Sequence, residues 1–285
     1  MNLGLMMAGF QASGKTTFLA ALYEWVQAGV ENGLRLRHEP EDREYFFDIS
    51  QQWLQLEELA RTDIAAPRNT ELPLLDASGF AFDLQIPDVV GEHFGQAWER
   101  DDWPEEVSQI AMSADGLLLF VRGFDLKPPL RLPPGESVAD HLHSDEDVPD
   151  SKSAHREWEA SEAPTQTILA DLLEGIRDRR ESMPVAVVIS AWDRVLDESA
   201  MTPDTWLQSN LPLLWQMLEG RSEEIRYRVF GISAQGGDLT QPEKHDELAQ
   251  VRPPYKRIIV QEGETRTSDI GAPISWLLEQ SRGTA

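Results

Sequence analysis

Cysteine is absent from the 285 residues of this sequence. Without thiols the chain has no disulfide bonds, no thiolate zinc site and no cysteine nucleophile, so the protein classes that depend on them are excluded. Chains without disulfides are typical of reducing compartments, and we expect a cytoplasmic location.

Long hydrophobic runs are also absent. No stretch approaches the roughly 18 consecutive apolar residues that indicate a membrane-spanning helix. The first ten residues, MNLGLMMAGF, lack the basic start of a signal peptide. We therefore expect no leader and no membrane insertion.

Positive charge is scarce in this chain. It has 25 Lys and Arg residues against 50 Asp and Glu residues, which gives a formal net charge of -25. Such a surface repels the phosphates of DNA and RNA and the headgroups of anionic lipids. We therefore expect no nucleic-acid partner.

Apolar residues are nevertheless plentiful, at 41% of the chain, which is enough for a packed core. Short apolar runs typical of buried strands alternate with stretches of helical spacing. This alternation predicts a mostly parallel sheet with helices on both faces, and the turn DASG adds one antiparallel hairpin strand. The expected fold is α/β in three layers, a mostly parallel sheet between two layers of helices, with residues 1–285 forming a single domain.

We expect strands at 3–8, 34–38, 72–75, 80–86, 116–121, 184–190, 226–232 and 256–260, and helices at 16–28, 41–61, 103–113, 165–181, 203–219 and 269–280. Residues 123–163 differ from the rest, with five prolines before residue 150 and nine acidic side chains between Glu136 and Glu162. This composition predicts a mobile, acidic, proline-rich surface insertion, with a partner-docking arm as the alternative.

The stretch GFQASGKT, residues 9–16, follows the first expected strand and opens the first expected helix. It fits the GxxxxGK[ST] pattern of a phosphate loop, in which glycines let successive backbone N–H groups face one cluster of anionic oxygens. Lys15 is expected to reach the β- and γ-phosphates, and the Thr16 hydroxyl to bind Mg²⁺. The expected nucleotide contacts in this loop are Gly9, Gln11, Ala12, Ser13, Gly14, Lys15, Thr16 and Thr17.

A second phosphate-side segment, PDVVGEHFG, follows the second strand of the hairpin. Asp88 is expected to hold Mg²⁺, directly or through water, and Gly91 to offer its N–H to the γ-phosphate. A loop threonine ahead of the hairpin is where switch-type NTPases place another Mg²⁺ ligand. Thr70 is the first candidate for this ligand and Thr62 the second. Arg68 is a candidate for stabilising the phosphate charge.

Two later strands end in loops that we expect at the same edge of the sheet. Asp193 follows the strand in VVISAWDR, and Ser233 and Ala234 follow the strand in VFGISAQGG. An aspartate there can accept hydrogen bonds from N1–H and the N2 amino group of guanine, a pair of donors that adenine lacks. A backbone N–H after Ser233 can donate to guanine O6. These two loops, and not the phosphate loop, therefore indicate guanine.

The five segments, in the order GFQASGKT, Thr70, DVVGE, SAWD and SAQ, span residues 9–235. Together they resemble the Ras-like, TRAFAC-class P-loop GTPases. More narrowly, the extra helix before PRNTEL, the DVVGEHF segment and the ending SDIGAPISWLLEQ resemble the bacterial double-GTPase domains, which are often encoded in conflict or defence operons. The resemblance implies GTP or GDP as the ligand, Mg²⁺ as the cofactor, and a protein effector or operon partner that responds to the nucleotide.

Two departures from that family affect the expected chemistry. Its base motif NKxD is here SAWD, so Ser190 and Ala191 replace the bracing asparagine and the lysine that lies along the guanine ring. After the DxxG glycine, where the family has glutamine or sometimes histidine, stand Glu92 and His93. A carboxylate beside an anionic γ-phosphate is unfavourable, so we expect slow intrinsic hydrolysis, raised by a partner that supplies an arginine. The candidate catalytic groups are Lys15, Arg68, Glu92 and His93.

Three functions fit these segments. They are a GTP-hydrolysing switch, a nucleotide-binding or pseudo-GTPase interaction module without significant turnover, and a P-loop protein that prefers ATP. The retained Lys15, Thr16 and Asp88 argue against complete loss of nucleotide binding, whereas the missing NKxD and Glu92 argue for weakened turnover. The hairpin before DVVG favours the GTPase over other P-loop classes.

Overall fold

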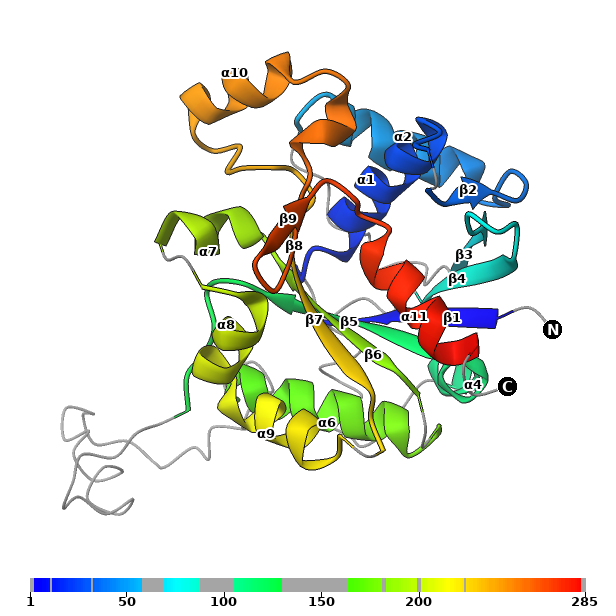
Figure 1. Ribbon diagram of the computed structural model, residues 1–285, viewed down its shortest axis with the longest axis vertical. Helices are drawn as coiled ribbons and strands as arrows, with labels where there is room; N and C mark the ends of the chain where they lie inside the picture. Colours follow the sequence, from blue (N-terminus) through cyan, green and yellow to red (C-terminus); the bar gives the residue numbers. More distant parts are fainter. Residues whose placement is uncertain are drawn as a thin grey trace, which may run out of the picture.

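A computed structural model describes residues 3–10, 12–31, 33–57, 69–87, 105–129, 163–180, 183–198, 201–222 and 224–282. Its strands are β1 (Leu3–Ala8), β2 (Arg35–Leu36), β3 (Asn69–Leu75), β4 (Ala81–Pro87), β5 (Gly116–Arg122), β6 (Val185–Ser190), β7 (Tyr227–Ser233), β8 (Ile259–Glu262) and β9 (Thr265–Thr267). In the described parts of the chain they form one sheet of order β2-β3-β4-β1-β5-β6-β7-β8-β9 (Figure 1).

The centre of the sheet is parallel and its two sides are antiparallel. β1 pairs in parallel with β4 and β5, and the series continues in parallel through β6 to β7. The hairpin β3–β4 is antiparallel, as expected, and so are the pairs β2–β3, β7–β8 and β8–β9. All carboxyl ends of the parallel strands therefore meet at one edge of the sheet, which is where α/β proteins bind ligands.

Helices cover both faces of the sheet, so the expected three-layer α/β fold is confirmed (Figure 1). On one face lie α1 (Lys15–Gln27), α2 (Arg43–Leu54) and α11 (Ala272–Arg282). On the other lie α4 (Glu105–Ser113), α6 (Thr165–Arg177), α7 (Trp192–Glu198), α8 (Pro203–Asn210) and α9 (Pro212–Gly220). No helix of the described residues is long and apolar enough to cross a membrane.

The two faces receive alternate side chains of the same strands. Leu118 and Phe120 of β5 join the core under α1, α2 and α11, whereas Leu117, Leu119 and Val121 join the core on the other face. A strand buried on both faces must be apolar at every position, which is why β5 reads as the unbroken run GLLLFV.

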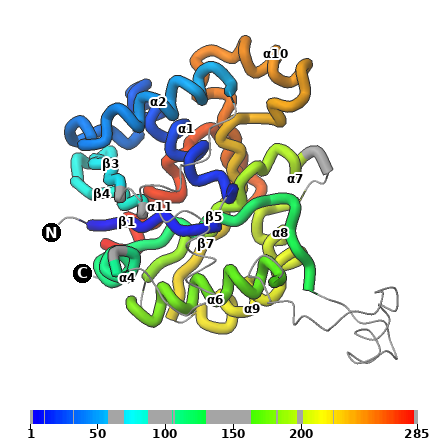
Figure 2. Tube along the Cα trace, turned by 180° about the vertical axis from the view of Figure 1, so that it is seen from behind, coloured from blue at the N-terminus to red at the C-terminus, as the bar shows by residue number. Residues whose placement is uncertain are grey.

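Several expected elements need correction. The single helix expected at 203–219 is two helices, because Pro212 has no N–H to donate within a continuous helix and begins α9 instead. The strand expected at 256–260 begins later, at Ile259, after a 3₁₀ turn, η2 (Pro254–Arg257). Helix α2 ends at Leu54, short of the expected residue 61. Helix α7, helix α10 (Pro242–Gln250) and strand β9 were not expected from the sequence. Seen from behind, α10 and α2 lie at the same end of the molecule (Figure 2).

The expected insertion at 123–163 lies mostly outside the described residues, but the structure shows how the chain leaves the sheet and returns. The N–H of Lys127 donates to Thr165 Oγ1 at 2.9 Å, and the N–H of Thr165 donates to Lys127 O at 3.0 Å. The chain therefore departs after β5 and comes back before α6 at one point.

Candidate functional site

The phosphate loop follows β1 and ends against the SAWD segment. Gly14 caps α1 in the left-handed region, with φ 87°, where a Cβ is disfavoured. A Cβ at Gly14 would also lie 2.8 Å from Cβ of Ser190. At the other end of the loop, a Cβ at Gly9 would lie 2.7 Å from the carbonyl oxygen of Phe120 in β5. Both glycines are thus needed for the loop to approach the edge of the sheet this closely.

Lys15 folds back into this loop. Its Nζ donates to the carbonyl oxygens of Gly9 at 2.6 Å and Phe10 at 3.0 Å. The N–H of the buried Ser13 donates to Phe10 O at 3.2 Å and closes the turn. The ammonium group is therefore held at the amino end of α1, where the partial charge of the helix is also positive. This is an anion-binding arrangement in a chain whose net charge is -25.

The remaining described residues of the loop surround this charge. Thr16 and Thr17 lie in the first turn of α1 and are half-buried. The N–H of Phe18 donates to Gly14 O at 3.0 Å and begins the helical ladder, so the N–H groups of the residues before it face the loop. Ala12 is exposed and has φ 58°.

Thr70 lies in strand β3, and the expectation that it belongs to a loop is wrong. The hairpin register runs back from Leu75 to Asn69, so that Thr70 is paired with Ile86 of β4. Thr70 is only 4% exposed, and its hydroxyl donates to Oδ2 of Asp42, the N-cap residue of α2, at 3.1 Å. This bond joins the start of the hairpin to the start of α2.

The oxygen groups near these elements suit Mg²⁺ in kind. A hydroxyl that donates to a carboxylate, as that of Thr70 does, keeps its oxygen lone pairs for another partner. Thr16 offers a second hydroxyl, and hydroxyl and carboxylate oxygens are ligands of hard cations. Among the residues that the structure describes, no group of three or more His, Asp or Glu side chains is gathered as a metal site of its own.

Asp193 lies in the first turn of α7, just beyond the carboxyl end of β6. Ala191, with φ 51°, turns the chain so that Trp192 enters the core. Trp192 is fully buried, donates from Nε1 to Gln261 Oε1 at 3.0 Å, and packs edge-on against Trp206. The tryptophan is therefore a core residue that anchors the turn carrying Asp193.

Ser190 stands where the resembling family has its bracing asparagine. It is 8% exposed, and its carbonyl oxygen accepts from the N–H of Gly123 at 3.0 Å. Its Cβ faces Gly14 of the phosphate loop. Ser190 thus packs the SAWD turn directly against the phosphate loop.

Ser233 and Ala234 follow β7, beside the Asp193 turn. Ser233 is 1% exposed, and its Oγ accepts from the N–H of Gly236 at 3.0 Å, which closes a tight turn. The structure therefore brings the expected phosphate loop, the Asp193 turn and the Ser233 turn to the carboxyl ends of β1, β6 and β7, three strands of one parallel series. The other expected site residues lie outside the described part of the chain: Gln11, Thr62, Arg68, Asp88, Gly91, Glu92 and His93.

Residues that support the Ser233 turn were not foreseen from the sequence. Nε1 of Trp53, in α2, donates to Ala234 O at 3.0 Å. Arg257 donates to Gln235 Oε1 at 3.3 Å and lies over the Trp53 ring. Trp53 and Ala234 are 181 residues apart in the sequence, and Arg257 and Gln235 are 22 residues apart. No local sequence pattern predicts contacts over such separations.

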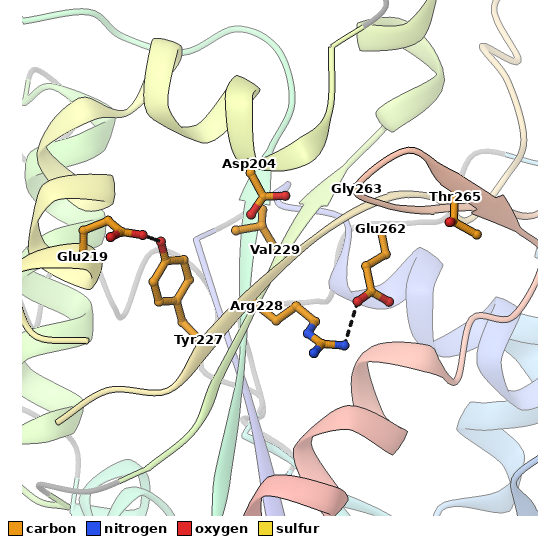
Figure 3. Close-up of a pocket in the computed structure, with 8 residues that line it drawn as sticks. All are labelled: Asp204, Glu219, Tyr227, Arg228, Val229, Glu262, Gly263 and Thr265. Carbon is orange, nitrogen blue, oxygen red and sulfur yellow. Dashed lines mark hydrogen bonds and ion pairs between the residues drawn. The ribbon is translucent and has the colours of Figure 1, made fainter. Parts of the chain in front are cut away.

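A pocket of about 660 Å³ lies elsewhere, between β7, β8 and the helices α8 and α9 (Figure 3). Within it the Tyr227 hydroxyl donates to Glu219, and Arg228 pairs with Glu262 at 2.6 Å. Burial raises the pKa of Asp204, and the neighbouring Glu262 adds to this effect. None of the expected nucleotide contacts lines this pocket, so it is separate from the phosphate loop.

Comparison with solved structures finds similar chains at low sequence identity. The signal recognition particle receptor SRb-GTP/SRX complex from Chaetomium thermophilum is 14% identical, with 82% of this chain and 91% of that chain covered and a TM-score of 0.38. The GTPase-like domain of Ski7 from S. cerevisiae, bound to GDP and inorganic phosphate, is 11% identical, with 99% and 50% covered and a TM-score of 0.48. The cytosolic domain of the T. maritima FeoB iron transporter, in a GDP form, is 14% identical, with 89% and 65% covered and a TM-score of 0.35. This chain thus spans about half of the Ski7 chain, and at these scores the likenesses carry no functional argument.

Comparison with protein families gives a decisive result. No curated protein matches the sequence. The model of the family described as Double-GTPase 1 matches residues 6–277, which include the phosphate loop, the Asp193 turn and the Ser233 turn. The match covers nearly the whole chain and agrees with the loops that the structure brings to one edge of the sheet. The chain belongs to the Double-GTPase 1 family.

Proposed function

We propose that this protein is a guanine-nucleotide-dependent switch, which binds GTP with Mg²⁺, hydrolyses it slowly, and passes the difference between its GTP and GDP states to a protein partner. The observation that carries the proposal is the close packing of Gly14 on Ser190, which puts the phosphate loop and the SAWD turn in direct contact. A nucleotide spans both regions, because its phosphates and its base need separate binding groups.

The phosphates would bind to the loop at residues 9–16. The Lys15 ammonium and the amino end of α1 supply positive charge there, and the first-turn N–H groups supply donors. In this proposal phosphate oxygens replace the carbonyl oxygens of Gly9 and Phe10 as partners of Lys15. Mg²⁺ would be bound by Thr16 and Thr70, with Asp88 as a further ligand, and it would neutralise phosphate charge.

The base would bind between Asp193 and the Ser233 turn. Asp193 would accept from guanine N1–H and N2, and the N–H groups after Ser233 would donate to O6. Ser190 cannot reach as far as an asparagine, so packing of Trp192 in the core takes over the bracing of this turn. Guanine selectivity would then depend on Asp193 and on the Ser233 turn together.

Hydrolysis is proposed to be slow for an electrostatic reason. Glu92 occupies the position where a neutral side chain would orient the attacking water, and its charge opposes that of the γ-phosphate. His93 is the alternative group for the water, and Arg68 is a candidate for stabilising the transition state. An arginine supplied by a partner would raise the rate.

The partner is proposed to be a protein effector, encoded with this chain in a bacterial defence operon, and the location to be the cytoplasm. The resemblance of the ending SDIGAPISWLLEQ to bacterial double-GTPase domains supports this context. The net charge of -25 favours a protein partner over nucleic acid.

A second candidate function is an interaction module that binds nucleotide without significant turnover. The replacement of NKxD by SAWD and the glutamate at position 92 favour it over a rapid enzyme. A preference for ATP is the third reading, and it requires that Asp193 does not contact the base.

Calorimetric titration with GTP, GDP, ATP and GTPγS in the presence of Mg²⁺ tests the proposal. We expect wild type to bind the guanine nucleotides more tightly than ATP and to release phosphate slowly from GTP. Lys15→Ala should lose binding by about 100-fold or more, because a charged contact to phosphate is removed from a partly desolvated loop.

Arg226→Ala is the matched control. Arg226 is exposed, precedes β7 at the amino edge of the sheet and donates to Gln280 Oε1 at 3.3 Å, so its removal changes the net charge equally at the edge opposite to the phosphate loop. Equal affinity of wild type for ATP and GTP would remove Asp193 as a base-reading residue. Binding of GTP without any phosphate release would favour the interaction module, and binding of no nucleotide would overturn the proposal.

A further inference from the structure

We name Ser233–Gly237, the end of β7 and the turn that follows it, the base loop. Residues outside the usual nucleotide-binding segments hold this loop in place. Gly236 has φ 88°, and a Cβ there would lie 2.1 Å from the carbonyl oxygen of Arg257. The loop is thus in backbone contact with η2. Its position depends on the elements that pack behind it, namely η2 and α2.

Trp53 fixes one peptide of the base loop. The residue is in the last turn of α2 and is fully buried, and its Nε1 donates to Ala234 O at 3.0 Å. In a trans peptide the C=O and the following N–H point in opposite directions. The bond that holds the Ala234 carbonyl therefore turns the N–H of Gln235 away from Trp53, and it fixes the orientation of the donors after Ser233.

Arg257 holds both Trp53 and the base loop. Its guanidinium lies 3.8 Å from the centroid of the Trp53 ring, donates to the Trp53 carbonyl oxygen, and donates to Gln235 Oε1 at 3.3 Å. Arg257 is 5% exposed, and among the described residues no carboxylate lies within ion-pairing distance of it, Glu24 acting only from farther away. Its Nε has no hydrogen-bond partner in the described part of the chain.

Burying a cation with no carboxylate in ion-pairing distance costs free energy of folding, so other contacts must stabilise Arg257 at this position. Burial lowers the pKa of Arg257 to about 10, Arg252 adds to this effect, and Glu24 opposes it. The group is still a cation at neutral pH. It stacks on an aromatic face and donates to one carbonyl and one amide oxygen, which is how a planar guanidinium is stabilised when no carboxylate is within ion-pairing distance.

We infer that Trp53 and Arg257 are positioning residues for the guanine base: they set the direction of the base-loop N–H groups that donate to O6. The inference rests on the proposed function. Helix α2 and η2 thereby take part in base selection, although neither carries a base-reading segment. In the same proposal Asp193 contacts N1–H and the N2 amino group, which lie beside O6, and its turn has an anchor of its own in Trp192.

The test uses a matched pair of tryptophan variants. Trp53→Phe removes the indole donor and keeps an aromatic ring under Arg257. Trp276→Phe is the control, because Trp276 is also buried, at 6% exposure, but lies in α11 away from the base loop. Affinities are measured by calorimetry for GDP, for 6-thio-GDP, in which a weak acceptor replaces O6, and for IDP, which keeps O6 but lacks the N2 amino group.

We expect Trp53→Phe to weaken GDP binding by about tenfold and to bring the GDP to 6-thio-GDP affinity ratio close to one, while the GDP to IDP ratio stays at its wild-type value. A general loss of folded protein would lower all three affinities together and leave both ratios unchanged. Trp276→Phe should leave both ratios unchanged.

Gln235→Ala gives a second test at a half-buried position, where the core is not disturbed. It removes the acceptor of Arg257, and we expect it to shift the GDP to 6-thio-GDP ratio in the same direction by about two- to threefold. A wild-type ratio in both Trp53→Phe and Gln235→Ala would overturn the inference. Failure of the wild-type protein to bind GDP would overturn the proposed function itself, which is a distinct outcome.

Discussion

Arg194 and Asp238 join the two turns that flank the proposed base site. Arg194 follows Asp193 in α7, and one of its terminal nitrogens donates to Oδ2 of Asp238 at 2.8 Å. Asp238 comes directly after the base loop, and its Oδ1 accepts from the N–H and the hydroxyl of Thr240. Each turn therefore restrains the other through one carboxylate.

This carboxylate makes stability depend on pH. Hydrogen bonds from Thr240, and then the pairing with Arg194, lower the pKa of Asp238 from 3.8 to about 2, although partial burial opposes them. Because the folded pKa is depressed, the stabilisation is fully present above the unfolded value of 3.8 and is lost as pH falls toward 2. We expect Asp238→Asn to lower the free energy of unfolding by about 1–2 kcal/mol at pH 7 and by much less at pH 2.5.

Urea unfolding of both proteins at the two pH values measures this difference. Asp246→Asn is the control, because the Asp246 side chain in α10 is 83% exposed and its change should be near zero. A difference between wild type and Asp238→Asn that does not change with pH would contradict the assigned role of the carboxylate.

The contact between Gly14 and Ser190 gives a second prediction. Gly14→Ala places a Cβ at φ 87° and 2.8 Å from Ser190 Cβ, so it combines backbone strain with a clash. We expect a loss of about 2–4 kcal/mol in unfolding free energy and at least a tenfold loss in GDP affinity. Urea unfolding measures the loss of stability, and calorimetry measures the loss of GDP affinity.

Gly79 provides the control for strain alone. It has φ 83°, and a Cβ there would have no neighbour within 4 Å, so Gly79→Ala should cost only about 1 kcal/mol. The double variant Gly14→Ala, Ser190→Gly removes the clashing atom and should recover the larger part of the loss. If the double variant recovers nothing, the packing of the two loops is not the source of the effect.

Thr70 tests the Mg²⁺ side of the proposal. Thr70→Val keeps the shape of the side chain but removes the hydroxyl that donates to Asp42. We expect the Mg²⁺ concentration for half-maximal GTPγS binding to rise about tenfold, since an oxygen ligand is lost, while Thr70→Ser keeps the wild-type requirement. A wild-type requirement in Thr70→Val would leave the hydroxyl with a structural role only, and Thr62 would become the candidate ligand.

Glu92 carries the prediction on turnover. Glu92→Gln replaces a charged group by a neutral one of the same size that can still orient water. We expect phosphate release under single-turnover conditions to rise about tenfold with little change in GDP affinity. His93→Ala is measured beside it, because a large loss there and no gain in Glu92→Gln would show that the histidine is the group that acts on the water.

The centre of the fold could be predicted from the sequence because burial on both faces leaves an unmistakable pattern. The strands β1, β5 and β6 are unbroken apolar runs, and each was expected within one residue of its observed bounds. The phosphate loop lies between β1 and α1 as its glycine pattern requires. Helix α7 escaped notice because it has only seven residues, too few for a helical period to be recognised.

The supports of the site could not be predicted, for a different physical reason. Trp53 lies 181 residues from Ala234, and Arg257 lies 204 residues from the Trp53 carbonyl. Hydrophobic periodicity reports which face of an element is buried but not which distant residue it meets. Thr70 was assigned to a loop because the stretch TDIAAPRNTEL contains a proline and small residues, although hairpin pairing extends back to Asn69.

The paired bonds between Lys127 and Thr165 bear on how such a chain evolves. Because the two ends of the intervening stretch are hydrogen-bonded to each other, the length of that stretch does not alter the position of the sheet. Lengthening that stretch costs only a slowly growing loop-closure entropy, and neither β5 nor α6 has to move. The acidic stretch can thus gain, lose or exchange sequence without displacing the loops at the carboxyl edge of the same sheet.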